Sequence, residues 1–331
     1  MFLRGIEEPC DGTCSWLLDH EVYKAWRESQ VTRLLWPCGP PGCGKTTLAS
    51  FALRDWKENF QNTHTAGYFF FNRQYDKAKS PLNFLSAIIH QLMQLYPLAG
   101  ELIEDICGPT KLHILIQVLD GLSKPSDPPE KPLIYVLDAI DECSDTASSQ
   151  FLQRLYKEVY ASKFPVKMLI TCRRDCIDRL HGQGPIPNRI DIDHENTSDI
   201  AKYVHGELCT WYSMRGNADV AATLERAIIY RAEGIFLWVV LVVEGLLGSD
   251  SELDTVLGTI HSFPQGKDEK LRKVYEEILK QATNDFKEKN VAVSIKSILS
   301  IVITSATPLT IKELEVCLAA GGSGFGRFSG T

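Results

Sequence analysis

The amino-acid sequence predicts an α/β fold in which helices cover both faces of a parallel β-sheet. Three observations support this prediction. Short apolar segments alternate with amphipathic, helix-like segments, as consecutive parallel strands require. A glycine-rich loop joins the first of these strands to a helix. The third strand is apolar along its whole length, which is typical of a sheet that is buried on both faces.

Five strands are expected, and they end near residue 194. They are "TRLLW", "AGYFFF", "LIYVLD", "KMLIT" and "RIDI", at residues 32–36, 66–71, 133–138, 167–171 and 189–192. Beyond the sheet the pattern becomes helical. We therefore expect a helical lead-in at 1–30, a sheet-containing core at 31–194, a helical subdomain at 195–262, a further helical segment at 263–320 and a glycine-serine tail at 321–331.

Composition excludes several classes of protein. The 331 residues are 44% hydrophobic and 23% charged, which is ordinary for a globular chain. The formal net charge of -7 provides no basic surface for a nucleic-acid backbone, so no nucleic-acid partner is expected. The most apolar run, Ile235–Leu247, is short and contains Glu244, which indicates a buried helix and not a membrane span. The ten cysteines form no CxxC pair, which favours reduced thiols in a cytoplasmic protein.

The segment "RLLWPCGPPGCGKTTLASFAL" contains the pattern G-x-x-x-x-G-K-[ST], known as Walker A, from Gly39 to Thr46. Glycines let the backbone N–H groups of such a loop turn inward around a phosphate, and the following helix directs its positive dipole end to the same anion. We expect Lys45 to reach the β- and γ-phosphates, Thr46 to bind Mg²⁺ and Thr47 to contact the α-phosphate side. The expected nucleotide-binding residues are Gly39, Gly42, Cys43, Gly44, Lys45, Thr46 and Thr47.

Three carboxylates follow the apolar strand "LIYVLD" within five positions. A buried carboxylate needs a partner, and the Walker A loop supplies one at the same edge of the sheet. Asp138 is therefore expected to hold Mg²⁺ together with Thr46, and Asp141 or Glu142 to orient the attacking water. The residues do not decide between those two acids. Capping of the next helix by Asp141 or Glu142 is the alternative.

The strand that follows, "VKMLITCRRD", ends in two arginines. At this edge Arg173 can sense the γ-phosphate and stabilise transferring charge, and we count it with Asp141 and Glu142 as a catalytic candidate. Arg174 is more simply explained as part of a solvated basic turn. A further feature is Pro37, which lacks a ladder donor and is expected to shorten the first strand or distort the loop after it.

Six segments follow one another along the chain: "LLWPCGPPGCGKTTLAS", "YFFFNRQYD", "LIYVLDAIDEC", "KMLITCRRD", "DIAKYV" and "AEGIFLWVVLVVEGL". In this order they resemble the NACHT-type signal-transduction NTPases of the STAND class. The nephrocystin-like form found in fungal sensors is the most similar, from about Cys14 to Ala320. After the third strand come a small residue, an apolar residue, Asp and Glu, and this order is typical of the family. Two departures are "TCRRD" where the family usually has T-S-R-P, and Pro37 where it has a β-branched residue.

The resemblance implies a P-loop NTPase sandwich with strand order 5-1-4-3-2, followed by a helical region and a winged helix. It also implies an ATP/ADP and Mg²⁺ switch that self-associates with ATP bound, and it suggests that "CDGTCSWLL" lines the adenine site. Because "TPLTIKELEVCLAA" soon gives way to "GGSGFGRFSGT", we expect the winged helix to be truncated. Effector and repeat domains are expected to be absent from this chain.

Two other functions stay open. A degenerate interaction scaffold without nucleotide binding would agree with Pro37 and the truncation, whereas Lys45, Thr46 and Asp138 oppose it. A stand-alone P-loop kinase would need an acceptor site and a lid, for which the sequence contains no clear signal. Slow ATP hydrolysis that serves a switch is the activity we expect.

Overall fold

The computed structural model describes residues 9–29, 34–73, 75–105, 111–122, 131–143, 164–181, 188–213, 218–247, 295–305 and 309–321, with a few short stretches between 153 and 283. The chain divides into two compact units, residues 1–263 and 264–331. The finer domain boundaries expected near residues 31, 195 and 321 remain predictions.

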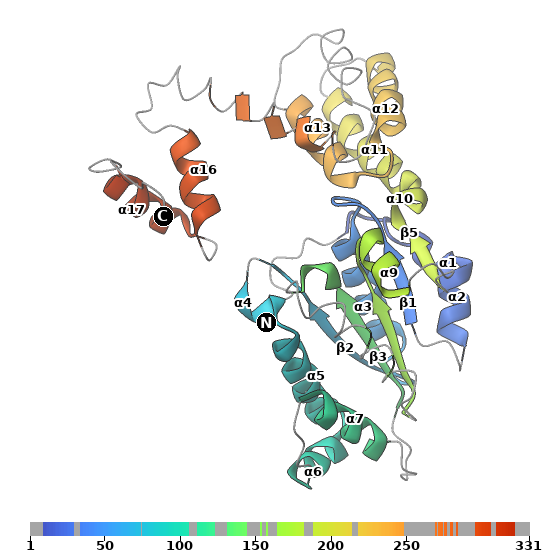
Figure 1. Cartoon of the computed structure of the whole chain (residues 1–331). Helices are drawn as coiled ribbons and strands as arrows, with labels where there is room; N and C mark the ends of the chain where they lie inside the picture. Colours follow the sequence, from blue (N-terminus) through green and yellow to red (C-terminus); the bar gives the residue numbers. More distant parts are fainter. Residues whose placement is uncertain are drawn as a thin grey trace. The chain divides into compact units, whose positions relative to one another are not determined.

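A five-stranded parallel sheet forms the centre of the first unit (Figure 1). Its strands are β1 (Leu34–Cys38), β2 (Thr65–Phe70), β3 (Leu133–Asp138), β4 (Val166–Ile170) and β5 (Arg189–Asp191). Their order is β2-β3-β4-β1-β5, and every pairing is parallel. The expected order 5-1-4-3-2 is confirmed, with β4 between the strand that precedes the glycine loop and the strand that ends in carboxylates.

Pro37 interrupts the ladder between β1 and β4. The two strands pair at Leu34 and Leu35, and contact resumes only as a single bridge between Cys38 and Cys172. Proline has no N–H to donate, but the Pro37 carbonyl still accepts the Cys172 N–H at 3.3 Å. On its other side β1 pairs with β5 through Pro37 itself. The strand is therefore not shortened, since it continues to Cys38.

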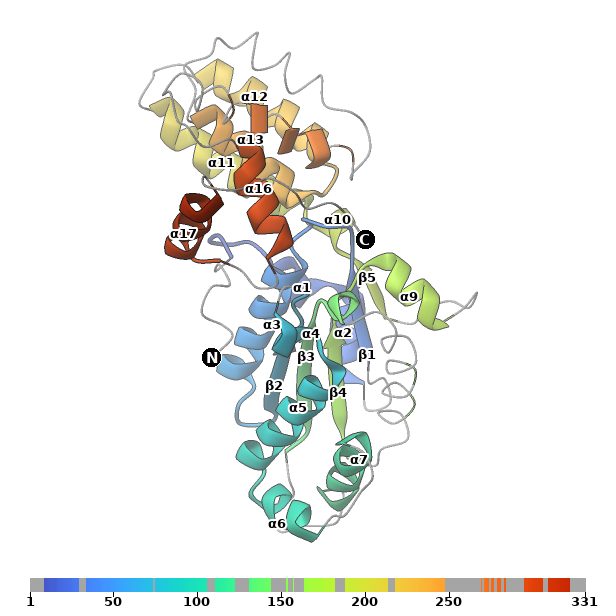
Figure 2. The same ribbon diagram turned by 60° about the vertical axis from the view of Figure 1, so that its left-hand side comes forward.

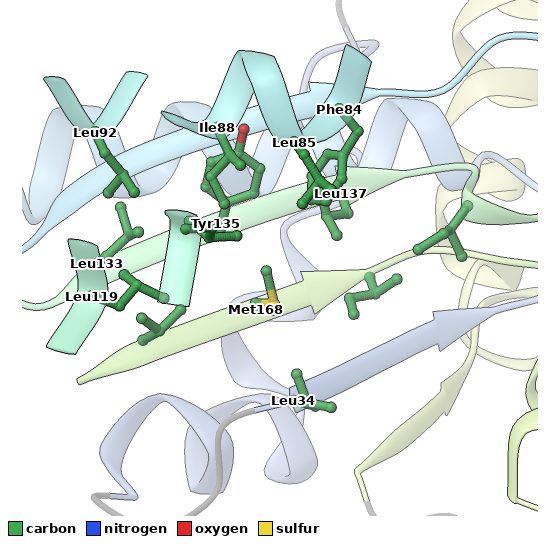
Figure 3. Packing of buried hydrophobic residues seen from close by; sticks show 14 of the residues in the cluster. Leu34, Phe84, Leu85, Ile88, Leu92, Leu119, Leu133, Tyr135, Leu137 and Met168 are labelled. Carbon is green, nitrogen blue, oxygen red and sulfur yellow. The ribbon is translucent and has the colours of Figure 1, made fainter. Parts of the chain in front are cut away.

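One face of the sheet packs against α5 (Pro81–Leu95), α6 (Pro97–Asp105) and α7 (Lys111–Leu122) (Figure 2). Figure 3 shows alternate β3 side chains pointing into this layer, because successive strand residues face opposite sides of the sheet. The buried residues labelled there are Leu34, Phe84, Leu85, Ile88, Leu92, Leu119, Leu133, Tyr135, Leu137 and Met168.

The other face packs against α1 (Trp16–Asp19), α2 (Glu21–Glu28) and α3 (Lys45–Asn59). Trp26 and Trp56 are buried there with ring centroids 6.4 Å apart, and the Trp56 indole N–H donates to the Tyr23 hydroxyl at 2.8 Å. These contacts attach the N-terminal helices to α3. The contacts lie near the carboxyl end of α3, whereas residues of the segment before α1 lie near its start, where Thr13 and Cys14 share a cavity lining with Gly44 and Thr47.

Short elements begin where strands end. β2 is followed by α4 (Asp76–Lys79), β3 by a 3₁₀ turn (Ile140–Glu142), β4 by α9 (Arg174–His181) and β5 by α10 (Ile192–Glu195). Parallel strands bring all of these carboxyl ends to one edge of the sheet. The residues that the sequence singles out lie at this edge.

The helical part of the first unit consists of α11 (Thr197–Ser213), α12 (Ala218–Ala232) and α13 (Phe236–Leu247). α11 begins at Thr197, directly after Asn196. Trp238, Val239 and Val243 of α13 are buried, most of its other described residues are half-buried, and Glu244 is exposed, so the predicted buried helix is partly buried in the structure. None of the helices in the described ranges is both long and apolar enough to cross a bilayer.

In the second unit the structure describes α16 (Ile295–Thr304) and α17 (Ile311–Gly321). A capping box begins α17, because Thr310 N–H donates to Glu313 Oε2 at 2.8 Å and Glu313 N–H donates to Thr310 Oγ1 at 3.3 Å. The tail after residue 321 and most of the predicted helical segment at 263–294 lie outside the described residues.

Candidate functional site

The glycine loop, residues 39–46, joins β1 to α3 and needs glycine at two positions. Gly42 has φ 76° and Gly44 has φ 95°, in the left-handed region that side chains disfavour. A Cβ at Gly42 would also lie 2.8 Å from the Leu237 Cβ on α13, so the loop passes tightly under the helical part. The amino end of α3 begins at Lys45, which directs its free N–H groups and positive dipole end to the loop.

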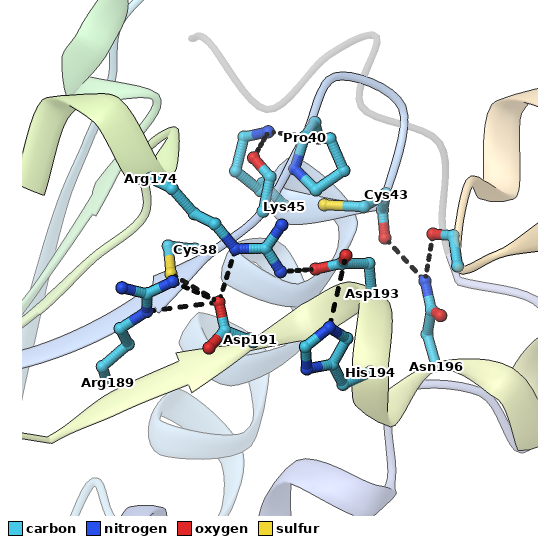
Figure 4. Close-up of polar contacts among 12 residues, drawn as sticks. Cys38, Pro40, Cys43, Lys45, Arg174, Arg189, Asp191, Asp193, His194 and Asn196 are labelled. Carbon is cyan, nitrogen blue, oxygen red and sulfur yellow. Dashed lines mark hydrogen bonds and ion pairs between the residues drawn. The ribbon is translucent and has the colours of Figure 1, made fainter. Parts of the chain in front are cut away.

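Lys45 folds back over its own loop. Its Nζ donates to the carbonyl oxygens of Gly39 at 3.0 Å and Pro40 at 2.8 Å (Figure 4). The ammonium therefore lies across the concave side of the loop, where its partners are neutral carbonyl groups. An anion would form a stronger, charge-assisted bond with the same ammonium.

Asp138 forms the polar centre of the site together with two threonines. Thr46 Oγ1 donates to Asp138 Oδ2 at 2.8 Å, and Thr171 Oγ1 donates to Asp138 Oδ1 at 2.6 Å. The carboxyl group is only 2% exposed, and this burial raises its pKa to about 6, against the hydrogen bonds from Thr171 and Thr46, which lower it. Thr171 is itself held in place by the Ala139 N–H, which donates to its hydroxyl at 2.9 Å.

A second polar group gathers residues from the ends of β2, β3 and β4. Arg173 Nε lies 3.1 Å from Asp141 Oδ2, and the Arg173 backbone N–H donates to Asp141 Oδ1 at 3.1 Å. Glu142 Oε2 accepts the Arg73 backbone N–H at 3.0 Å, and the Arg73 guanidinium donates to the Asp141 carbonyl at 3.2 Å. The three catalytic candidates thus lie together, and both oxygens of Asp141 are engaged by Arg173.

Arg174 corrects a sequence-based interpretation. It does not lie in a solvated turn: its Nε donates to Asp191 Oδ1 at 2.7 Å and its NH2 donates to Asp193 Oδ1 at 2.5 Å, and its side chain is 30% exposed (Figure 4). The Asp193 side chain has no exposure at all. With Arg189, these hydrogen bonds and ion pairs hold the pKa of Asp191 at about 2, although burial alone would raise it. Arg174 therefore joins α9 to β5 and α10.

Several residues of the site were not predicted from the sequence. Thr171 directly follows β4 and Arg73 lies three residues after the end of β2, so proximity to a strand end was the one signal available in the sequence. Asn196 was overlooked because it precedes a helix, where Asn usually caps. Instead, its Nδ2 donates to the Cys43 carbonyl at 3.0 Å and to the Gly234 carbonyl at 2.9 Å, connecting the glycine loop to the turn before α13.

A cavity of about 240 Å³ lies beside the glycine loop. It is bounded by the N-terminal segment, the start of α3, the residues around α10 and α11, and α13. Its lining includes Thr13, Cys14 and Trp16 from the segment before and in α1, which the resemblance associated with a base. Gly44 and Thr47 form the wall next to the loop. The cavity is thus continuous with the position where phosphates would lie over the loop.

Comparison with known proteins agrees with this geometry. Residues 12–173 match the family model described as "Nephrocystin 3, N-terminal". Vegetative incompatibility protein HET-E-1 of Podospora anserina is 23% identical over 326 residues, covering 92% of this chain and 22% of that protein. The chain therefore spans about a fifth of the length of this curated relative.

Solved structures resemble the chain only loosely. The Aeropyrum pernix ORC1 protein, in complex with DNA, is 13% identical with a TM-score of 0.43, and the alignment covers 93% of this chain and 77% of that one. The Walker-type ATPase paby2304 of Pyrococcus abyssi is 12% identical with a TM-score of 0.43, covering 95% and 91%. The fold assignment rests on the strand order itself. The matched family model and the similarity to HET-E-1 support a NACHT-like P-loop NTPase, and the strand order agrees with this assignment.

Proposed function

We propose that this chain binds ATP or ADP with Mg²⁺ and acts as a conformational and self-association switch in intracellular signalling. Support comes from the glycine loop, from the Thr46–Asp138 pair and from the hydrogen bonds between the loop and the helical part. The proposed partners are the nucleotide and other copies of the chain. The cytoplasm is the proposed location, in agreement with the buried cysteines Cys14, Cys38 and Cys43, which are not joined in disulfides.

The phosphates would lie over the glycine loop. The N–H groups of the loop and the amino end of α3 would bind the β-phosphate, Lys45 the β- and γ-phosphates, and Thr47 the α-phosphate side. In binding the phosphates, Lys45 would exchange the carbonyls of Gly39 and Pro40 for charged oxygens. Removal of this side chain should therefore weaken binding without affecting the core.

Thr46 and Asp138 suit Mg²⁺ because a hydroxyl and a carboxylate are hard oxygen donors, and they already lie 2.8 Å apart. When bound, the ion would neutralise phosphate charge and so assist phosphoryl transfer. Asp138 would bind the ion as a carboxylate, and the positive charge of the ion would favour that ionised form. Thr171 supports that ionised form by donating to the same carboxylate.

Hydrolysis, if it serves the switch, would use the acids after β3. Both oxygens of Asp141 are engaged by Arg173, so we assign orientation of the water to Glu142. Asp141 would then hold Arg173 at the γ-phosphate end of the site. The Arg173 side chain is 49% exposed, which leaves it accessible to a ligand. Slow turnover would suit such a switch.

The observation that carries the switch proposal is the direct bonding between loop and helices. The Gly42 carbonyl accepts the Leu237 N–H of α13 at 2.9 Å, and Asn196 bonds the Cys43 carbonyl and the Gly234 carbonyl together. A nucleotide that alters the loop backbone therefore acts on the start of α13. To change a population from 1:99 to 99:1, ATP and ADP must differ in their preference by about 5.5 kcal/mol.

The test is the melting temperature of the purified chain with and without Mg-ATP and Mg-ADP, in wild type, Lys45→Ala and the exposed control Lys77→Ala. Nucleotide at a thousandfold excess over Kd should stabilise the fold by about 4 kcal/mol. We expect nucleotide to raise the melting temperature of the wild type and of Lys77→Ala, but not of Lys45→Ala. Sedimentation velocity should then show larger species with Mg-ATP than with Mg-ADP. If Lys45→Ala shows the same rise in melting temperature as the wild type, nucleotide binding at the glycine loop is excluded. If the chain sediments equally with Mg-ATP and Mg-ADP, the self-association switch is excluded.

A second candidate function is an interaction scaffold that no longer binds nucleotide. One observation favours it: the ladder between β1 and β4 is interrupted at Pro37, directly before the glycine loop. Absence of any nucleotide-dependent shift in folded wild-type protein would support this candidate.

A further inference from the structure

A thiol, an imidazole and a carboxylate meet on the helical part, outside the proposed nucleotide site. They belong to Cys209 and His205 on α11 and to Glu225 on α12. Cys209 Sγ lies 3.4 Å from His205 Nε2 and 3.7 Å from His205 Nδ1. His205 Nδ1 in turn lies 3.4 Å from Glu225 Oε2. The three groups therefore form a continuous polar chain from carboxylate to imidazole to thiol.

Helical spacing and helix packing bring these residues together. Cys209 follows His205 by four positions, and side chains four apart on a helix lie on the same face. Glu225 is 20 positions from His205 along the chain and reaches it because α12 packs against α11 (Figure 1). The contact with Glu225 therefore depends on the folded helical part, and it holds the imidazole beside the sulfur.

The carboxylate determines which imidazole nitrogen carries the proton. An ionised carboxylate only accepts hydrogen bonds, so the nitrogen that faces Glu225, Nδ1, is the donor of the neutral imidazole. Nε2, the nitrogen nearer to Cys209 Sγ, then has a free lone pair and can take the thiol proton. The resulting imidazolium would lie between two negative groups. A nucleophile, a base and a residue that orients the base are the parts of an activated thiol.

Accessibility separates this thiol from most of the other cysteines in the described ranges. Cys209 is exposed, and the His205 side chain is 64% exposed, so a reagent can reach the sulfur from solvent. Cys14 and Cys38 are buried, and burial raises the pKa of each thiol to about 12. Such thiols are protonated and inert at neutral pH, because the thiolate is the form that reacts. Cys10 is also exposed, which makes it a reference for an accessible thiol in the same chain.

We propose that Cys209 is a site of reversible modification by low-molecular-mass disulfides, with His205 as the base and Glu225 as the residue that positions it. His205 Nε2 takes the proton of the thiol, and the thiolate attacks one sulfur of the disulfide. A new S–S bond forms at Cys209 as that of the disulfide breaks, and the second half leaves as a thiolate, which takes the proton from the imidazolium. The disulfide is thus the oxidant, and a small thiol reverses the reaction.

The experiment follows the reaction of the chain with oxidised glutathione at pH 6.5 and at pH 9.5, with circular dichroism to verify folding at each pH. Mass spectrometry of peptic peptides from acid-quenched samples identifies each modified cysteine and gives its rate. At pH 6.5 only about 1% of an ordinary thiol is ionised, so the activated Cys209 should react at least about tenfold faster than Cys10. Dithiothreitol should restore the unmodified mass.

Three variants test the assigned roles. His205→Gln keeps a hydrogen-bonding side chain that takes up no proton; we expect Cys209 to react at least about tenfold more slowly than in the wild type at pH 6.5 and within about threefold of it at pH 9.5, where solvent ionises an ordinary thiol. Glu225→Gln should slow the reaction at pH 6.5 by about two- to fivefold, since an exposed charge pair is lost. Glu207→Gln makes the same charge change two residues from Cys209, where side chains do not face each other, and should keep the wild-type rate.

Each other outcome overturns a stated part of the proposal. Equal rates at Cys209 and Cys10 at pH 6.5, or equal rates in wild type and His205→Gln, would exclude activation of this thiol. A loss in His205→Gln that is as large at pH 9.5 as at pH 6.5 would show altered access and exclude base catalysis. A wild-type rate in Glu225→Gln would exclude the positioning role. All of these measurements are made without nucleotide, so they stand or fall independently of the proposed function.

Discussion

Thr171→Val tests the polar centre of the site most directly, because valine has nearly the same shape as threonine but no hydroxyl. In the structure that hydroxyl is fully buried, donates to Asp138 Oδ1 at 2.6 Å and accepts the Ala139 N–H at 2.9 Å. The substitution leaves no cavity, so its effect reports these two hydrogen bonds alone. Both Asp138 and Ala139 would keep a buried, unpaired polar atom.

The expected magnitude follows from those two contacts. A bond to a charged group contributes about 1.5–3 kcal/mol and an unpaired buried N–H costs about 1–3 kcal/mol, so with incomplete additivity we expect a loss of about 3 kcal/mol in the free energy of unfolding. For a unit of this size that corresponds to roughly 6–12 °C in Tm. The pKa of Asp138 should also rise further above 6, because the Thr171 hydrogen bond lowers it.

The assay is thermal melting of nucleotide-free protein at neutral pH, followed by circular dichroism. Thr171→Ser is the matched control, because it keeps the hydroxyl and loses only a methyl group. We expect the serine variant to melt well above the valine variant and closer to the wild type. If valine and serine variants melt within about 2 °C of each other, the hydroxyl does not support the site, and the reasoning from these contacts is refuted.

Three further predictions concern the same edge of the sheet. Folding raises the pKa of Asp138 from 3.8 to about 6, so the contribution of this group to stability is present below pH 3.8 and is lost as the pH rises through 6. Asp138→Asn should therefore raise the Tm of nucleotide-free protein at pH 7.5. The same variant should abolish stabilisation by Mg-nucleotide, and differential scanning calorimetry measures both effects. Gly42→Ala would place a side chain at a positive φ, with its Cβ 2.8 Å from a Leu237 carbon of α13. We expect it to lower the free energy of unfolding by at least about 1–3 kcal/mol in urea titrations. Gly100→Ala is the control and should not lower it in this way, because the space around Gly100 is open. Arg174→Ala should cost about 3 kcal/mol in urea titrations, because it removes the arginine of an ion pair whose Asp193 side chain is fully buried. Lys24→Ala is the control, since Lys24 and its partner Asp19 are 43% and 87% exposed and the loss should stay below about 1 kcal/mol; equal losses would contradict the assignment of Arg174.

Much of the fold follows from short-range patterns. Leu133–Asp138 is a strand because its side chains are apolar on both faces, and the structure reproduces its bounds. The loop at residues 39–46 is specified by glycines that can take a positive φ and by the helix that starts at Lys45. Strand order came from family resemblance, since periodicity alone does not say which strands are neighbours.

The candidate site was predicted only where the chain itself carries the pattern. Asp138 ends β3, and Asp141, Glu142 and Arg173 lie three or four residues after the end of β3 or β4; parallel strands bring these ends together. Arg174 was misinterpreted because its two carboxylate partners lie 17 and 19 positions further along the chain, where charge patterning gives no sign of a pairing. The ranking of Glu142 over Asp141 likewise needed the contact between Asp141 and Arg173.

By itself, the sequence determined the strands, the glycine loop and the acids that follow β3, because each depends on residues that are close together in the chain. Only the tertiary structure decided which side chains share a buried environment. Asp199 meets the backbone of Cys14 across 185 positions, and Asn196 meets Cys43 across 153. The pairing of buried polar atoms is a property of three-dimensional packing, and so these long-range contacts become visible only in the folded chain.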